Sequence, residues 1–140
     1  MHTSGSIIAL LGLACLFGGM VFFGTIMTPL VFTKLPPETA GLFIRATFPR
    51  YYLYVTITAA IAALGLLLRG NPPLALILAL VLVLTLWLWQ EWLPHLNTLR
   101  DTGQLAAFAR GHRLSVWLNG AQLLAVLAVL IAVARGWGRG

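Results

Sequence analysis

The sequence is poor in charge and nearly free of cysteine. Charged residues make up 9% of the chain, three of its 140 residues are acidic, and Cys15 is the single cysteine. One thiol forms no internal disulfide and is a poor metal site by itself, so we interpret Cys15 as a small packing residue. The sequence contains no glycine-rich phosphate loop, nucleophile elbow or paired carboxylates. It therefore does not favour an enzyme.

Apolar residues, in contrast, are abundant. They make up 60% of the chain, and the mean hydropathy is +0.94, far above the values typical of soluble proteins. Four apolar stretches are long enough to cross a hydrocarbon core about 30 Å thick, namely residues 7–32, 51–68, 73–93 and 114–134. The pattern predicts an all-α integral membrane protein with one domain, residues 1–140, whose four spans form an up-down-up-down bundle.

The first span carries small residues and a proline. Gly12, Cys15 and Gly19 share one helix face, which favours close approach of a neighbouring helix. Near the end of the span, Pro29 removes a backbone hydrogen bond, and we expect a kink there.

The connection between the first two spans contains a helix-start signal. Pro37 and Glu38 follow Pro36, and a proline at the first helical position with an acid in the first turn is typical of a helix N-terminus. We expect a short interfacial helix that ends at Phe48, before Pro49 bends the chain into the second span.

The third span is a run of leucine, valine and alanine that ends in Trp87, Trp89 and Trp92. We expect its tryptophan-rich part to face lipid. After Pro94, Asp101 and Gln104 have the spacing of a capping box. This predicts a final helix of about 34 residues, or roughly 50 Å at 1.5 Å per residue.

The basic residues indicate an orientation. The net charge is +6, but the basic side chains lie in short connectors beside the spans, so lipid headgroups and not nucleic acid are the expected partner. The first and third connectors hold Lys34, Arg45, Arg50, Arg100, Arg110 and Arg113, and the opposite side holds Arg69, Arg135 and Arg139. The bias predicts that both termini are periplasmic. The lack of a long acidic or glycosylated ectodomain fits a bacterial inner membrane.

A polar stripe marks the last span. His112, Ser115, Asn119 and Gln122 recur at steps of three and four, so they share one helix face. Unpaired amides and hydroxyls are costly in hydrocarbon, and the stripe must therefore face protein, water or a ligand. Two interpretations stay open. The residues either bond to neighbouring helices or line a cleft open to the cytoplasmic side.

The alternating topology brings other polar residues to the same side of the membrane. The candidate ligand site therefore also includes Thr25, Thr28, Arg50, Tyr51 and Glu91. Glu91 itself has two interpretations. It either pairs with Arg45, Arg50 or Arg100 at the interface, or it accepts a proton or cation.

A metal site has only weak candidates. Glu91 and His95 are four residues apart, and His112 could approach them from the next helix. Pro94 disturbs the turn that would align the first two, and no histidine lies inside a span to hold a haem. We therefore predict no metal and no cofactor.

Two segments of the chain carry a recognisable order of motifs. Residues 19–41 read GMVFFGTIMTPLVFTKLPPETAG and are followed by FPRYY at 48–52, and residues 112–119 read HRLSVWLN. Together they resemble the transmembrane protein 205-like family, a set of four-span proteins whose domain has no assigned function. The resemblance covers nearly the whole chain. It implies that Pro29 and Phe32 end the first helix and that His112, Ser115 and Asn119 mark the last.

These observations leave three functions open. The first is a transport-related or small-ligand or ion-binding membrane protein, expected to be a homo-oligomer because one four-helix bundle leaves little room for a pore. The alternative is an accessory subunit of a larger membrane complex. The third is a metal or redox protein, which the lack of cysteine and methionine clusters does not favour.

Overall fold

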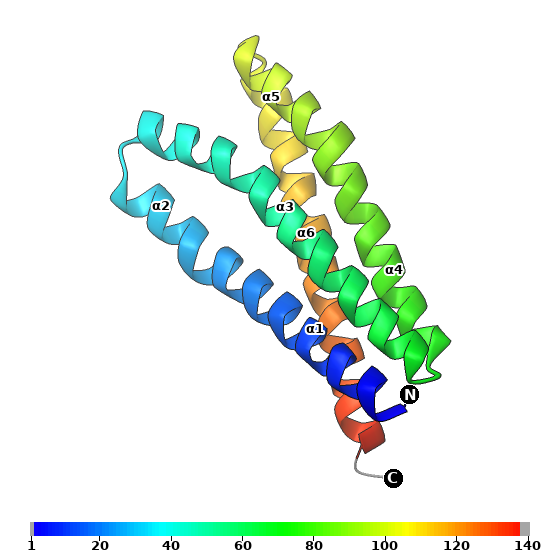
Figure 1. The fold of residues 1–140 in the computed structure, drawn as a ribbon. Coiled ribbons are helices and arrows are strands. Elements are labelled where there is room, and N and C mark those ends of the chain that lie inside the picture. Colours follow the sequence, from blue (N-terminus) through cyan, green and yellow to red (C-terminus); the bar gives the residue numbers. More distant parts are fainter. Residues whose placement is uncertain (1, 138–140) are drawn as a thin grey trace.

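The computed structural model describes residues 2–137, which fold into long helices with short connections (Figure 1). The helical elements, in chain order, are α1 (His2–Phe22), η1 (Phe23–Met27), α2 (Thr28–Lys34), α3 (Pro37–Leu68), α4 (Pro72–Trp87), η2 (Leu88–Trp92), α5 (Leu93–Asp101) and α6 (Leu105–Trp137). The elements α1–η1–α2 form one continuous helix, as do α4–η2–α5. In the described part of the chain, four helices are long and apolar enough to cross a membrane. The predicted all-α fold with four spans is confirmed.

The helices alternate in direction. Figure 1 shows the start of α1 and the end of α6 at one end of the bundle, and the α2–α3 and α5–α6 connections at the other. Helix α3 packs against α1 on one side and α4 on the other, while α6 contacts α1, α4 and α5. Arg139, one of the basic residues used for the orientation, lies outside the described residues.

Close packing of small residues joins α1 to α3, as the glycines of the first span predict. A Cβ atom on Gly12 would lie 2.7 Å from the backbone nitrogen of Ala62, and Gly65 lies directly against Ala9. Backbones approach this closely only where side chains are missing. Cys15 is exposed, and its carbonyl accepts a hydrogen bond from the Tyr54 hydroxyl of α3 at 2.6 Å, so its interpretation as a small packing residue stays a prediction. It lies one position away from the buried line of Ala9, Gly12 and Leu16.

Helix α3 differs from the prediction at Pro49. The expected short helix does not end at Phe48, because α3 continues through Pro49 to Leu68. Proline removes one backbone donor but its fixed φ suits a helix, so the helix bends and does not stop. The first turns of α3 lean away from the rest in Figure 1. Beside the bend, Nη1 of Arg50 donates to the Ala46 carbonyl at 2.6 Å.

The other two prolines within long helices each follow a π-helical turn. η1 ends two residues before Pro29, and η2 ends two residues before Pro94. A π-helical turn contains one extra residue, so side chains beyond it lie on a different face than a regular α-helix would give them. The irregularity expected near Pro29 is therefore a change of register, and Pro94 does not end the third helix.

The expected helix cap at Asp101 is also wrong. Asp101 is the last residue of α5, and its carboxylate binds Arg45. The chain turns at Gly103, which has a φ of +75°, a value that glycine adopts without strain. Helix α6 then has 33 residues, close to the predicted length.

Candidate functional site

A cavity of about 470 Å³ lies between the first half of α3 and the α5–α6 pair. This is the end of the bundle where α2–α3 and α5–α6 connect (Figure 1). Most of the wall is apolar or aromatic, and the polar side chains in it are Arg45, Tyr52, Asn97, Arg100, His112 and Ser115. The volume is in the range of small-molecule sites, which are mostly apolar with a few polar groups.

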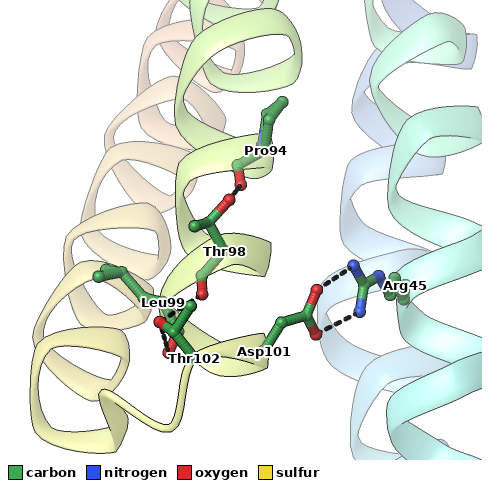
Figure 2. A network of polar contacts seen from close by, with 6 residues as sticks. All are labelled: Arg45, Pro94, Thr98, Leu99, Asp101 and Thr102. Atoms are coloured by element: carbon green, nitrogen blue, oxygen red, sulfur yellow. Dashed lines mark hydrogen bonds and ion pairs between the residues drawn. The ribbon is translucent and has the colours of Figure 1, made fainter.

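An ion pair connects the two sides of the cavity at its rim. Nη1 and Nη2 of Arg45 donate to Oδ1 and Oδ2 of Asp101, each at 2.8 Å (Figure 2). This two-point contact joins α3 to the end of α5. The side chains stay 43% and 52% exposed, and exposed ion pairs contribute little to stability.

Hydroxyl groups hold the end of α5 beside this ion pair. Figure 2 shows the Thr98 hydroxyl donating to the Pro94 carbonyl and the Thr102 hydroxyl donating to the Thr98 carbonyl, at 3.1 and 2.8 Å. Both bonds run along the helix that carries Asp101. They leave the Asp101 carboxylate free to point across to α3.

Arg100 is the second arginine of the cavity. Its guanidinium lies 5.9 Å from the ring centroid of Phe108, within the range of a cation–π contact. It also lies directly against Gly41, where a Cβ atom would collide with it. In the described part of the chain, no carboxylate forms an ion pair with Arg100.

The inner end of the cavity is formed by α6 and η2. Nε1 of Trp92 donates to the Ser115 hydroxyl at 2.9 Å and to the Gly111 carbonyl at 3.3 Å. The His112 ring stacks on Phe108, with ring centroids 6.0 Å apart. Ser115 is buried and His112 is half-buried, so the first two residues of the polar stripe face the cavity.

The deeper two residues of the stripe do not line the cavity. Gln122 is 3% exposed, and its amide nitrogen donates to the Val81 carbonyl at 3.0 Å and to the Thr85 hydroxyl at 2.9 Å. Gln122 therefore joins α6 to α4. Asn119 donates to the Ser115 carbonyl of its own helix at 2.8 Å, and its amide lies beside the Tyr52 hydroxyl. Gln122 fits the interpretation as a contact between helices, whereas His112 and Ser115 line a cavity.

The remaining candidates do not line the cavity. They are Thr25, Thr28, Arg50, Tyr51 and Glu91. The Thr25 hydroxyl donates to the Val21 carbonyl at 2.6 Å. The Tyr51 ring stacks on Phe23 at 4.2 Å. Helices α3, α5 and α6 supply nearly all the lining residues, and the first helix supplies Phe32.

Glu91 is exposed on η2. No ion pair of Glu91 is present in residues 2–137, and Arg45 binds Asp101 instead. The interpretation of Glu91 as the partner of Arg45, Arg50 or Arg100 is therefore wrong, since the carboxylate that binds Arg45 is that of Asp101.

The weak metal candidates stay apart. Within the described residues, no three His, Cys, Asp or Glu side chains are grouped so that they could hold a metal ion. His95 is exposed and its ring lies 5.4 Å from that of Trp92, whereas His112 faces the cavity.

Five lining residues are absent from the site that the sequence predicts, namely Tyr52, Trp92, Asn97, Arg100 and Phe108. Asn97 and Arg100 lie in a stretch whose sequence resembles a connector, and the position of Trp92 at the end of an apolar span is typical of a residue that faces lipid. Pro94 accounts for the omission of Asn97 and Arg100. If the third helix continues past Pro94, these two residues follow Trp92 by about one and two helical turns.

The chain matches the model of one family, described as Domain of unknown function (DUF4149), over residues 11–105. This is more than half of the 140 residues. Comparisons with curated proteins and with solved structures find no match. The matched region contains the α3, η2 and α5 walls of the cavity and ends before His112 and Ser115.

Proposed function

This chain belongs to the DUF4149 family, and we propose that it is an integral membrane protein that binds a small amphipathic molecule in the cavity between α3, α5 and α6. The observation that carries the proposal is the combination of apolar walls with a basic rim in one cavity of about 470 Å³. An apolar body and a polar end are the two features that such a cavity complements.

The composition of the walls argues against a small hydrated ion as the ligand. Ile44, Phe48, Leu93, Leu96 and Phe108 supply apolar surface and no ligand oxygen. An ion would lose its hydration there without replacement. A hydrocarbon chain or ring would instead bury its surface against them.

We propose that the protein lies in a bacterial inner membrane with periplasmic termini. The excess of basic residues in the α2–α3 and α5–α6 regions supports this orientation. The cavity would then open near the cytoplasmic surface. The motifs at 19–41 and 112–119 support membership in the transmembrane protein 205-like family, which stays a proposal.

A transport-related role requires the ligand to leave the cavity on another side, and a single bundle of four helices offers little room for a path. We therefore propose a homo-oligomer. Size measurement in mild detergent would give a multiple of the chain mass. A larger assembly with a different protein would support the accessory-subunit alternative instead.

Cavity filling tests the binding function. Asn97 lines the cavity and is half-buried, so Asn97→Trp fills space without replacing a core residue. The control is Leu80→Trp, at an α4 position that is 61% exposed and outside the lining. The probes are 1-oleoylglycerol and 1-oleoyl lysophosphatidic acid, detected by native mass spectrometry of the purified full chain.

We expect the wild type and Leu80→Trp to retain one amphiphile per chain, and Asn97→Trp to lose it. Absence of both probes from the wild-type protein, or equal retention by Asn97→Trp, would overturn the proposed function.

A further inference from the structure

We propose that the ligand has an acidic headgroup of phosphate type, bound at the cavity rim by Arg100 and Arg45, and that Asp101 competes with this headgroup for Arg45. The inference rests on the proposed function and adds the chemical class of the ligand. It also gives the ion pair at the rim a role in binding.

The charges of the lining point to an anion. Arg45, Arg100 and His112 line the cavity, and its lining within residues 2–137 includes no aspartate or glutamate. Guanidinium groups bind phosphate and carboxylate oxygens through paired hydrogen bonds, and these charge-assisted bonds are stronger than neutral ones.

Arg100 is positioned for such a headgroup. The ring of Phe108 holds it on one side, and the missing side chain of Gly41 makes room for it on the other. It forms no ion pair in the described part of the chain, although Asp101 is the next residue. Its donors are therefore available for a ligand oxygen.

The contact between Arg45 and Asp101 shows how an oxyanion fits the rim. Two carboxylate oxygens accept from two guanidinium nitrogens at 2.8 Å each, which is the geometry a phosphate group would also use. Because both side chains are about half exposed, separating them costs little. A headgroup can take the place of the Asp101 carboxylate on Arg45.

Two sources could supply the headgroup, an acidic amphiphile or free phosphate. The apolar walls favour the amphiphile, because a free phosphate would leave Ile44, Leu96 and Phe108 facing an empty or water-filled space. Water in an apolar cavity lacks the polar partners that hold it.

Three probes separate the contribution of the headgroup to binding from that of the acyl chain. The purified full chain is titrated with 1-oleoyl lysophosphatidic acid, with 1-oleoylglycerol, which has the same chain and no charge, and with inorganic phosphate. We expect the lysophosphatidic acid to bind about a hundredfold tighter than the neutral analogue, since a charge-assisted hydrogen bond to each of the two arginines contributes about tenfold. Inorganic phosphate should not displace it at equal concentration.

Variants of single arginines test the rim. Arg100→Gln should weaken binding of the lysophosphatidic acid about tenfold and leave 1-oleoylglycerol unchanged. The matched control is Arg113→Gln, since Arg113 is an exposed arginine of α6 outside the lining. It should change neither affinity.

The two sides of the ion pair give the sharpest test, because both Arg45→Gln and Asp101→Asn break the same contact. Competition predicts opposite results: Arg45→Gln weakens binding of the lysophosphatidic acid, and Asp101→Asn tightens it. A clamp that only holds α3 against α5 would give changes of the same sign.

Equal binding of the two oleoyl probes with no effect of Arg100→Gln would overturn the headgroup proposal while the binding function stands. Full displacement by inorganic phosphate at equal concentration would overturn the amphiphile assignment. Loss of binding in both rim variants would overturn the competition.

Discussion

The indole Nε1 of Trp92 donates to the hydroxyl of Ser115 at 2.9 Å and so joins η2 to α6 at the inner end of the cavity. Ser115 in turn donates to the Gly111 carbonyl at 3.3 Å, and Gly111 provides the space for Leu96 to pack against α6. A tryptophan of one helix and a short polar segment of another thus fix where the cavity ends.

Replacing Trp92 by phenylalanine removes this hydrogen bond and keeps an aromatic ring. We expect Trp92→Phe to lower the free energy of unfolding by about 1 kcal/mol, the net value of a hydrogen bond. Thermal unfolding in detergent measures the change. Trp117→Phe is the matched control, since Trp117 is 73% exposed on α6, and it should leave stability unchanged. Equal losses in the two variants would contradict the structural role of the bond.

The position of Trp92 also shows what the sequence could and could not predict. The four spans followed from hydropathy because each helix needs an apolar stretch long enough for the bilayer. The direction of Trp92 did not follow, because Trp92 lies within the π-helical turn η2, whose extra residue departs from regular α-helical spacing. No periodicity in the sequence indicates this change in spacing. The one sign of it is Pro94, two residues after η2.

The ion pair at the rim shows a second limit. Arg45 and Asp101 are 56 residues apart, and sequence offered several arginines as partners for few acids. Local spacing instead favoured Asp101 as a helix cap, which is wrong because α5 continues to that residue and the tertiary contact satisfies its carboxylate. His112 and Ser115 were found since their stripe lies within one regular helix.

The buried amide of Gln122 should stabilise the bundle without affecting the ligand. Gln122→Leu loses the bonds to Val81 and Thr85, and Thr85 keeps its own bond to the Val81 carbonyl at 2.7 Å. We expect a loss of about 0.6–1.7 kcal/mol, the range of hydrogen bonds between membrane helices. A double-mutant cycle with Thr85→Val isolates the pair. A coupling energy near zero would show that the two side chains do not support each other.

The contact between α1 and α3 should tolerate no side chain at its closest point. In Gly65→Ala, the added methyl would collide with the backbone of Ala9, and forcing the helices apart costs about 1–3 kcal/mol. Gly18→Ala is the matched control, since nothing lies within 4 Å of a Cβ atom there. Alanine favours the helix by up to about 1 kcal/mol over glycine. The two changes should therefore shift the unfolding temperature in opposite directions, and a stabilised Gly65→Ala protein would refute the close contact.

Gly41 tests the cavity through a residue that carries no charge. The three atoms nearest to a methyl group at this position all belong to the far end of the Arg100 side chain, which can move aside without disturbing a backbone. Gly41→Ala should therefore fold at least as stably as the wild type, while Arg100 leaves its place between Gly41 and Phe108. We expect affinity for 1-oleoyl lysophosphatidic acid to fall about tenfold, as in Arg100→Gln, and affinity for 1-oleoylglycerol to stay the same. The control Gly24→Ala, at an open position, should leave both affinities unchanged. Wild-type affinity of Gly41→Ala for the acidic probe would mean that Arg100 binds the headgroup equally well from another position. The contact of Arg100 with Gly41 would then have no part in recognition.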